Sequence, residues 1–508
     1  MKRTLAVAVA TALGALASSA EGVMLNPRGT GQVLIYPYYT VNHQQTLLSV
    51  INTTGHGKAL KVRFREGYDG REVAGFNVYL GPYDSWVGSV FGTGDEGNGA
   101  AAIATNDASC TVPGFIGLGT PVPGVPRVST LEFSNANYSQ GVYGTPTGTD
   151  HGPLGLTRTR EGFFEIIEMG EVVDQASGSP KTLEAITPVN GTPPGCEQVR
   201  DAWETSGYWT TNATTDLLPP AGGLYGAAGI VDVALGTLYA YDAIAIDAFS
   251  DVVQHSGPNN PKPNLATAIS DSAHDFATAY VPIGNAMVRA DYTASTAGVD
   301  AVSAVLMADT LYNEFDVESG VGAATDWVVT FPTKQFYVDP GLVNAYVQPF
   351  EERFDQTSCH EVGLVTHDRE GAGSPSGFCN LCPVNTHNYL CYETDILTFN
   401  MLPTEEGPSK GLGSTLVSLS VPDLVEFYGN YQLPTAGNMT LSFPREAQRL
   451  RPSSDGVAFI GLPATGFAAT NYINANVTPG VLSNYSATYS HRSHASCMSS
   501  ASPQSACQ

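Results

Sequence analysis

Four glutamates share one short segment and could supply acid–base chemistry. They are Glu161, Glu165, Glu168 and Glu171. In a helix this spacing puts all four on one face, whereas in a strand Glu165 and Glu168 point to opposite faces. Glycoside hydrolysis needs two facing carboxylates roughly 5–10 Å apart. We therefore expect a solvated acidic edge here, and a carbohydrate-active enzyme stays an alternative.

A second candidate is a group of cysteines with one histidine. Cys379, Cys382, His387 and Cys391 run C-x2-C-x4-H-x3-C, one residue short of a zinc-knuckle spacing. A knuckle would serve nucleic acid, which conflicts with a net charge of −25. Pro383 follows the C-x2-C pair and no βαβ pattern surrounds it, so a thioredoxin-like role is not favoured. Disulfides are the preferred interpretation, and metal binding is the alternative.

A glycine-rich stretch offers a third candidate. Residues 92–97, GTGDEG, match the bare G-x-G-x-x-G pattern, but no amphipathic helix follows and two carboxylates would repel a pyrophosphate. Asp95, Glu96, Asn98 and Asp107 are hard oxygen donors of the kind that calcium prefers, although their spacing matches no EF-hand. We expect a surface turn. No cofactor is expected, and calcium is the one candidate.

Two further motifs lack the surroundings that chemistry needs. Residues 407–411, GPSKG, have the spacing of a nucleophile elbow, which requires a strand before the serine and a helix after it. The sequence around Ser409 instead predicts a polar loop. His491 and His494 could ligate copper or zinc, but we expect them in a tail too mobile to hold a metal. No catalytic residue is therefore predicted.

The first twenty residues predict export. Lys2 and Arg3 precede a short apolar stretch, and small residues end at Ala20, as in a signal peptide. About 13 apolar residues are too few to cross a bilayer, which needs about 20. No later stretch reaches that length, so no transmembrane segment is expected. Removal of residues 1–20 would take the net charge from −25 to −27.

All eight cysteines follow this leader, and an even count in an exported chain indicates disulfides. Eight cysteines allow 105 pairings. We expect each pair to lie within one block of similar composition, where it would close a Gly/Pro-rich loop. The predicted pairs are Cys110–Cys196, Cys359–Cys391, Cys379–Cys382 and Cys497–Cys507.

The composition limits the class of protein. Charged residues make up 14% of the chain, with 48 acidic and 23 basic side chains, so Ser, Thr, Asn, Gly and Tyr must cover much of the surface. The excess of acidic residues argues against a nucleic-acid binder. An apolar content of 42% is sufficient for packed cores.

Five tyrosines cluster near the start of the chain: Tyr36, Tyr38, Tyr39, Tyr79 and Tyr83. We expect them to pack in the core, and stacking on a sugar is the alternative.

Hydrophobic patterning predicts the strands that must position the candidate functional residues. Residues 60–65 alternate strictly, with Leu60, Val62 and Phe64 on one side and the basic residues on the other. Further strands are expected at residues 32–36, 46–52, 76–80, 85–87, 128–133, 327–331, 415–421, 439–443 and 457–460, and a hairpin at 230–241. Residues 163–169 suit a strand or a helix. Residues 300–311 have helical spacing, and residues 92–155 are otherwise expected to form loops.

The predicted fold is therefore mainly β, an antiparallel β-sandwich, Ig-like or jelly-roll-like, with long loops, few helices and disulfide staples. The predicted regions are a signal peptide (1–20), an N-terminal β-sandwich region (21–200), a central β region with short helices (201–345), a Cys-containing C-terminal β region (346–489) and a Ser/Ala-rich tail (490–508).

Four segments carry a resemblance. Residues 29–39, GTGQVLIYPYY, 61–67, KVRFREG, 325–334, TDWVVTFPTK, and 461–467, GLPATGF, resemble a group of uncharacterised exported proteins of Gram-negative bacteria, usually described only as cell-surface proteins. The similarity spans most of the chain after the leader. It implies export and a surface location, and it implies no catalytic residue.

These observations favour a non-enzymatic, exported structural or adhesive β-protein. Its location would be the cell surface, associated with the outer membrane, or extracellular, with the periplasm as an alternative. Expected partners are cell-surface or matrix components and further copies of the chain, and not nucleic acid. A carbohydrate-binding or carbohydrate-active secreted protein and a metal-binding secreted protein are the alternatives.

Overall fold

Strands dominate the computed structural model. It describes residues 22–95, 98–117, 128–139, 150–175, 178–271, 273, 275–342, 347–373, 388–399, 407–421, 434–443, 448–474, 478, 480–481, 483–499 and 502–507. In that part of the chain the longest helix is α5 (Ala297–Leu306), and no helix is long and apolar enough to cross a membrane. The shorter helices are α2 (Thr182–Ile186), α3 (Cys196–Asp201), α4 (Tyr208–Thr211), α6 (Gln335–Val338), η3 (Leu156–Arg160), η4 (Leu265–Thr267) and η5 (Ser319–Val321).

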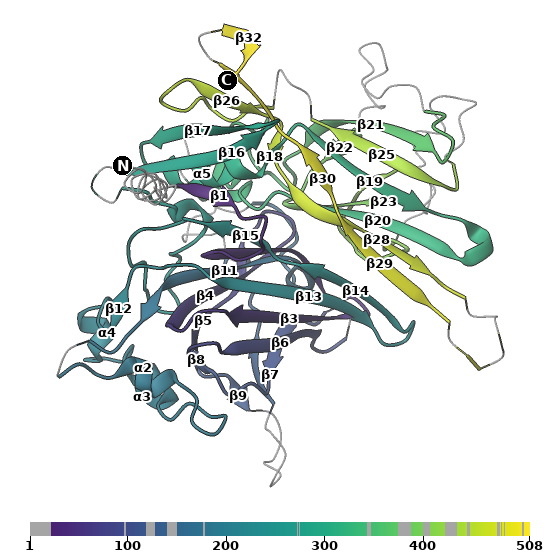
Figure 1. Cartoon of the computed structure of the whole chain (residues 1–508). Coiled ribbons are helices and arrows are strands. Elements are labelled where there is room, and N and C mark those ends of the chain that lie inside the picture. Colours follow the sequence, from purple (N-terminus) through teal and green to yellow (C-terminus); the bar gives the residue numbers. More distant parts are fainter. Residues whose placement is uncertain are drawn as a thin grey trace, which may run out of the picture.

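A sandwich of two large sheets occupies the left and lower parts of Figure 1. The ten-stranded sheet contains, in spatial order, β17 (Ala286–Thr293), β16 (Phe276–Ile283), β1 (Val23–Leu25), β15 (Ile244–Asp247), β2 (Val33–Thr40), β11 (Glu161–Val172), β4 (Gly57–Glu66), β5 (Glu72–Leu80) and β8 (Cys110–Val112), with β12 (Leu217–Leu218) beside β11. The seven-stranded sheet contains β14 (Thr237–Asp242), β13 (Leu224–Asp232), β3 (Gln45–Asn52), β6 (Ser85–Gly92), β7 (Ala101–Thr105), β10 (Ser129–Glu132) and β9 (Ile116–Gly117). Alternate residues such as Val62, Phe64, Trp86 and Val90 form the core between the two sheets.

The central strand β2 contains a proline, which cannot donate a ladder hydrogen bond. Pro37 lies where the pairing of β2 with β11 is irregular, between the partners Tyr36 and Tyr39, and β15 pairs only as far as Ile35. Its carbonyl accepts a 2.6 Å hydrogen bond from the hydroxyl of Thr330. The irregularity therefore lets β2 continue through the proline.

A second sandwich lies above and beside the first (Figure 1). One of its sheets contains β22 (Asn388–Leu390), β21 (His360–Asp368), β25 (Ala436–Ser442), β19 (Thr310–Asp316) and β30 (Arg492–His494), and the other β24 (Val417–Ser420), β23 (Thr394–Thr398), β20 (Ala323–Thr330), β28 (Thr465–Tyr472) and β29 (Tyr485–Ser490). Small sheets pair β18 (Met307–Ala308) with β27 (Leu462–Pro463), and β26 (Val457–Ile460) with β31 (Ser496–Ser499) and β32 (Ser502–Ala506).

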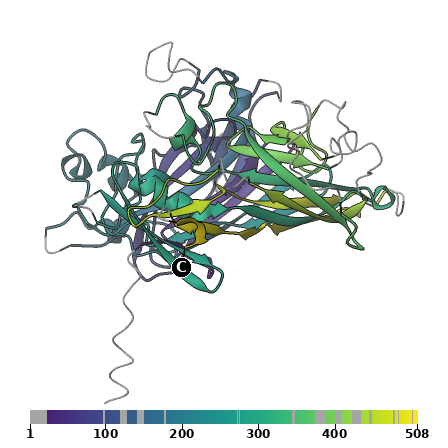
Figure 2. The same ribbon diagram turned by 90° about the horizontal axis from the view of Figure 1, so that it is seen from above.

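The sheet containing β20 contributes to two cores. Trp327 and Val329 pack into the core of the second sandwich, whereas Val328 and Phe467 pack into the core of the first. Phe467 stacks on Tyr241 of β14 with ring centroids 4.8 Å apart. Seen from above, the green and yellow strands lie over the purple strands (Figure 2). The two sandwiches therefore share one buried layer.

Disulfides fasten three places in the described part of the chain. They are Cys110–Cys196, Cys359–Cys391 and Cys497–Cys507, which are pairs that the sequence predicted. The fourth predicted pair, Cys379–Cys382, lies outside the described residues. Because disulfides persist in oxidising compartments, they indicate an exported environment.

Several details differ from the sequence expectations. Residues 101–105 and 110–112 form strands β7 and β8 where loops were expected, and the expected helix at 300–311 ends at Leu306. The tail is not mobile throughout, because β30 pairs with β19 and β31 pairs with β26. Strands on both sides of residues 200 and 345 share sheets, for example β3 with β13 and β20 with β23, so those predicted boundaries do not separate sheets.

Candidate functional site

The prediction that the four glutamates form a solvated acidic edge is wrong, because their segment is the central strand β11. All four glutamates of β11 are buried. Glu165 accepts from the guanidinium of Arg65 at 2.9 and 3.1 Å, and Glu161 accepts from the hydroxyl of Tyr38 at 2.7 Å. Ion pairs and hydrogen bonds from neighbouring strands explain why these carboxylates leave water. Buried in this way, they present no acid–base pair to a sugar.

The predicted metal ligands are divided. Cys379, Cys382 and His387 lie outside the described residues, and Cys391 is bonded to Cys359. The half-buried ring of His491 lies 2.9 Å from the Val328 carbonyl, which holds it against Trp327. His494 is exposed and pairs with Asp309 at 2.8 Å. No group of three His, Cys, Asp or Glu side chains in the described residues is arranged to hold a metal ion.

The candidate calcium donors lie near the end of β6 and after β7. Asp95 and Asn98 are exposed in the turn, and Glu96 lies outside the described residues. Asp107 accepts from the backbone and the hydroxyl of Ser109 at 2.8 and 2.6 Å, so it stabilises its own turn. Calcium binding at this turn stays a prediction.

Ser409 lies in a turn and not in a strand–helix elbow. Its backbone N–H donates to Ser414 at 2.9 Å and its hydroxyl accepts from the N–H of Ser414 at 3.0 Å. The side chain is buried. A nucleophilic serine must be exposed at the end of a strand, so this turn has a structural role, in agreement with the predicted polar loop.

The early tyrosines mostly serve the core. Tyr36, Tyr38, Tyr39 and Tyr79 are buried, whereas Tyr83 is exposed. Tyr36 stacks on Phe164 with ring centroids 4.1 Å apart. The core-packing interpretation is therefore confirmed for the buried four.

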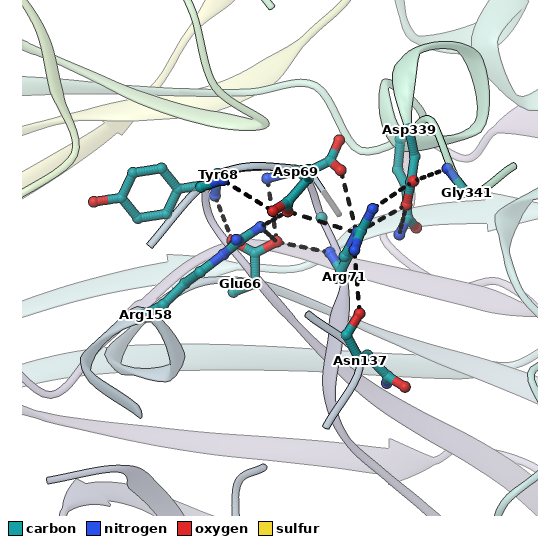
Figure 3. A network of polar contacts seen from close by, with 12 residues as sticks. Glu66, Tyr68, Asp69, Arg71, Asn137, Arg158, Asp339 and Gly341 are labelled. Carbon is teal, nitrogen blue, oxygen red and sulfur yellow. Dashed lines mark hydrogen bonds and ion pairs between the residues drawn. The ribbon is translucent and has the colours of Figure 1, made fainter. Parts of the chain in front are cut away.

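A buried charge network joins the two sandwiches (Figure 3). Its six members are Glu66, Asp69, Arg71, Asp150, Arg158 and Asp339, all almost fully buried. Arg158 donates to both oxygens of Glu66 at 2.8 and 2.9 Å and also to Asp150. Two parallel hydrogen bonds make this a strong, oriented pair.

Arg71 holds the other end of the network. It donates to both oxygens of Asp339 at 3.1 and 2.8 Å, and to the carbonyl of Asn137 at 3.2 Å. Its Nε lies 3.3 Å from Asp69. Asp339 follows α6 in the second half of the chain, so Arg71 fastens the β4–β5 turn to that helix (Figure 3).

Burial raises the pKa of two carboxyl groups here, one within the network and one beside it. Burial raises the pKa of Asp69 well above its usual value, and neighbouring Asp339 raises it further. Burial likewise raises the pKa of Glu393, which adjoins Gly70. Perturbed pKa values often mark active sites, but the burial of both groups keeps them from a substrate. The network is therefore a structural connection.

One accessible feature of the described residues is an apolar groove on the outer face of the seven-stranded sheet. Its volume is about 600 Å³. The lining residues, none of them charged, are Leu47, Leu48, Ser49, Val87, Gly88, Ser89, Ala104, Thr105, Asn106, Val128, Ala227, Ala228, Gly229, Leu238 and Ala240. Several large apolar side chains there face solvent, including Leu47, Val87 and Leu238.

Strand register explains the shape of this groove. Ala240 pairs with Gly229, Gly229 with Leu47, Leu47 with Ser89, and Ser89 with Ala104. Paired residues of adjacent strands point to the same face. A row of small residues therefore crosses five strands, with Leu47 as its one large member, exposed over 45% of its surface.

The sequence pattern of β3 and β14 indicates that the outer face of the seven-stranded sheet is apolar. Residues 46–51, TLLSVI, are apolar on both faces of β3, whereas a strand with one solvated face alternates with polar residues. In β14 Leu238 and Ala240 face outward while Tyr239 and Tyr241 face the core. Apolar residues on an outward face mark contact surfaces.

Comparison with known proteins adds no relative. No protein-family model, no curated protein and no solved structure matches this chain.

Proposed function

We propose that this chain is an exported, non-catalytic cell-surface protein with a structural or adhesive role, and that it binds a second copy of itself through the apolar groove. One observation carries this proposal. The groove crosses five strands without a charged lining residue, whereas the glutamates of β11 in the opposite sheet are buried. Such a surface suits contact with another apolar surface, and its lining includes no titratable side chain.

Charge supports a second copy as the occupant. Two copies of a chain with this large excess of acidic residues repel one another. At physiological ionic strength that repulsion is screened beyond about 8 Å, so a close contact is tolerated only where the facing surfaces lack charge. Among the described lining residues the groove meets this condition.

Shape supports the same occupant. Two copies related by a twofold axis present the same row to one another. Leu47 lies on β3, the middle strand of the five, with Gly229 and Ala240 on one side and Ser89 and Ala104 on the other. The Leu47 side chain of one copy can therefore pack onto small residues of the other.

The size of the face predicts a reversible contact. Five strands about 4.8 Å apart, each contributing about six residues of about 3.3 Å, cover an area of about 400 Å². Stable complexes bury about 800 Å² per partner. We therefore expect a weak dimer that forms where the local concentration is high, as on a cell surface.

Labelled-antibody electron microscopy of producing cells tests the proposal. Cells would make the natural chain, Leu47→Asp or Val233→Asp. Val233 is 76% exposed in the β13–β14 turn, outside the groove, so the two variants add the same charge at different places. We expect clustered label on the outer surface for the natural chain and Val233→Asp, and dispersed label for Leu47→Asp. Label confined to the cytoplasm, or equal clustering of the two variants, would contradict the proposal.

A further inference from the structure

A buried lysine lies between two buried glutamates on neighbouring strands. Lys58 Nζ of β4 is 2.8 Å from Glu168 Oε1 and 2.9 Å from Glu171 Oε1 of β11. The side chains of Lys58 and Glu168 are fully buried, and that of Glu171 is 11% exposed. Three ionisable groups are thus in direct contact almost without water.

A β-bulge brings the two glutamates together. Residues three apart in a regular strand point to opposite faces. In β11 the register shifts between Glu168 and Gly170, so that Glu168 pairs with Leu60 and Glu171 pairs with Lys58. Both carboxyl groups therefore reach the same ammonium group.

Backbone donors hold the Glu168 carboxyl group from its other side. The N–H of Gly222 donates to Oε2 at 2.7 Å and the N–H of Ala221 donates to Oε1 at 3.2 Å. Gly222 has a φ of +77°, a left-handed conformation that favours glycine. The two N–H groups bind different oxygens, so Gly222 is the backbone donor placed to stabilise negative charge on Oε2 in a tetrahedral intermediate.

We propose that Lys58 and Glu168 condense to an isopeptide amide that covalently joins β4 and β11. Transfer of one proton along their hydrogen bond converts the ammonium–carboxylate pair to an amine and a carboxylic acid. Burial raises the pKa of Glu168 to about 7, although Lys58 and the backbone donors act to lower it.

The condensation then balances without a co-reactant. The lone pair of Nζ attacks Cδ of Glu168 and forms the N–C bond, while the π electrons of the carbonyl move to the oxygen held by the backbone N–H. Glu171 accepts a proton from the attacking nitrogen and delivers it to the departing hydroxyl. The C–O bond breaks with its electron pair on oxygen, and one water molecule leaves.

The intact mass of the purified full chain, reduced and denatured, tests this inference. We expect a mass lower than that of the exported sequence by one water molecule, and a branched proteolytic peptide that contains both Lys58 and Glu168. The full sequence mass together with normal tryptic cleavage after Lys58 would overturn it. A branch to Glu171 would overturn the assignment of Glu168.

Variants separate the roles of the glutamates. Glu171→Gln removes the proton acceptor, so its mass should equal that of its sequence. Glu165→Gln is the matched control, because Glu165 is equally buried on β11 but pairs with Arg65, and it should keep the loss of one water. Loss of the crosslink in Glu165→Gln but not in Glu171→Gln would contradict the mechanism. The natural chain decides the question even where a variant fails to fold.

Discussion

Arg158 binds both carboxylate oxygens of Glu66, a residue that lies 92 positions earlier in the chain. Arg158 belongs to η3 and Glu66 ends β4, so the pair ties a connecting segment to the end of an interior strand of the first sandwich. Asp150 accepts a further hydrogen bond from the same guanidinium. The buried charge network thus holds segments that no local sequence pattern relates.

Removal of Arg158 is expected to destabilise the fold strongly. Arg158→Met leaves Glu66 and Asp150 buried without their cation, which costs about 3–5 kcal/mol in the free energy of unfolding. Arg289→Met is the control, because Arg289 has a 56% exposed side chain and forms a surface pair with Asp291, worth less than about 1 kcal/mol. Denaturant unfolding measures both. Equal effects would mean that the network does not hold the fold.

Acid should destabilise the protein through His255. Burial lowers the pKa of His255 from 6.5 to about 3. Its ring accepts from Tyr79 and donates to the Ala213 carbonyl, at 2.9 and 2.7 Å. Between pH 6.5 and 3 the unfolded chain therefore binds one proton more than the folded chain. The free energy of unfolding should fall with falling pH, by at most about 1.4 kcal/mol per pH unit from this residue.

His255→Gln should flatten that pH dependence, whereas replacement of the exposed His56 should leave it unchanged. Chemical denaturation at several pH values between 3 and 7 makes the comparison. The same slope in His255→Gln as in the natural chain would contradict the assignment.

The disulfides should contribute unequally. Cys110–Cys196 spans 86 residues and Cys497–Cys507 spans 10. From loop length alone, removal of the first pair by alanine should cost about 4.5 kcal/mol and removal of the second about 2.7 kcal/mol. Thermal unfolding of the two double variants measures the difference. A larger loss from the Cys497–Cys507 pair would show that loop closure does not govern their contribution.

Local patterning predicted much of the fold. The alternation of residues 60–65 and the apolar run of residues 327–331 correspond to β4 and β20. The helix was expected to reach Leu311, but Met307 and Ala308 pair instead with β27. Strand β7 was missed because AAIAT has no alternation of polar and apolar residues, and its pairing with β6 depends on tertiary contacts.

Burial of charge could not be predicted in the same way. Lys61, Arg63 and Arg65 alternate as expected, yet they do not face solvent. Lys61 donates to the carbonyl of Gly257 and Arg65 to the side chain of Gln335. These partners lie 196 and 270 residues away, so a local pattern of charges cannot distinguish a solvated face from a paired one.

The molar mass of the purified protein in solution, measured by sedimentation over a wide concentration range, tests the central claim most directly. We expect the natural chain and Val233→Asp to pass from monomer to dimer as concentration rises, and Leu47→Asp to stay monomeric. A natural chain that stays monomeric at every concentration, or a Leu47→Asp variant that dimerises as strongly as Val233→Asp, would contradict it. Flotation of monomeric natural chain with lipid vesicles, abolished by Leu47→Asp, would assign the groove to a lipid surface instead.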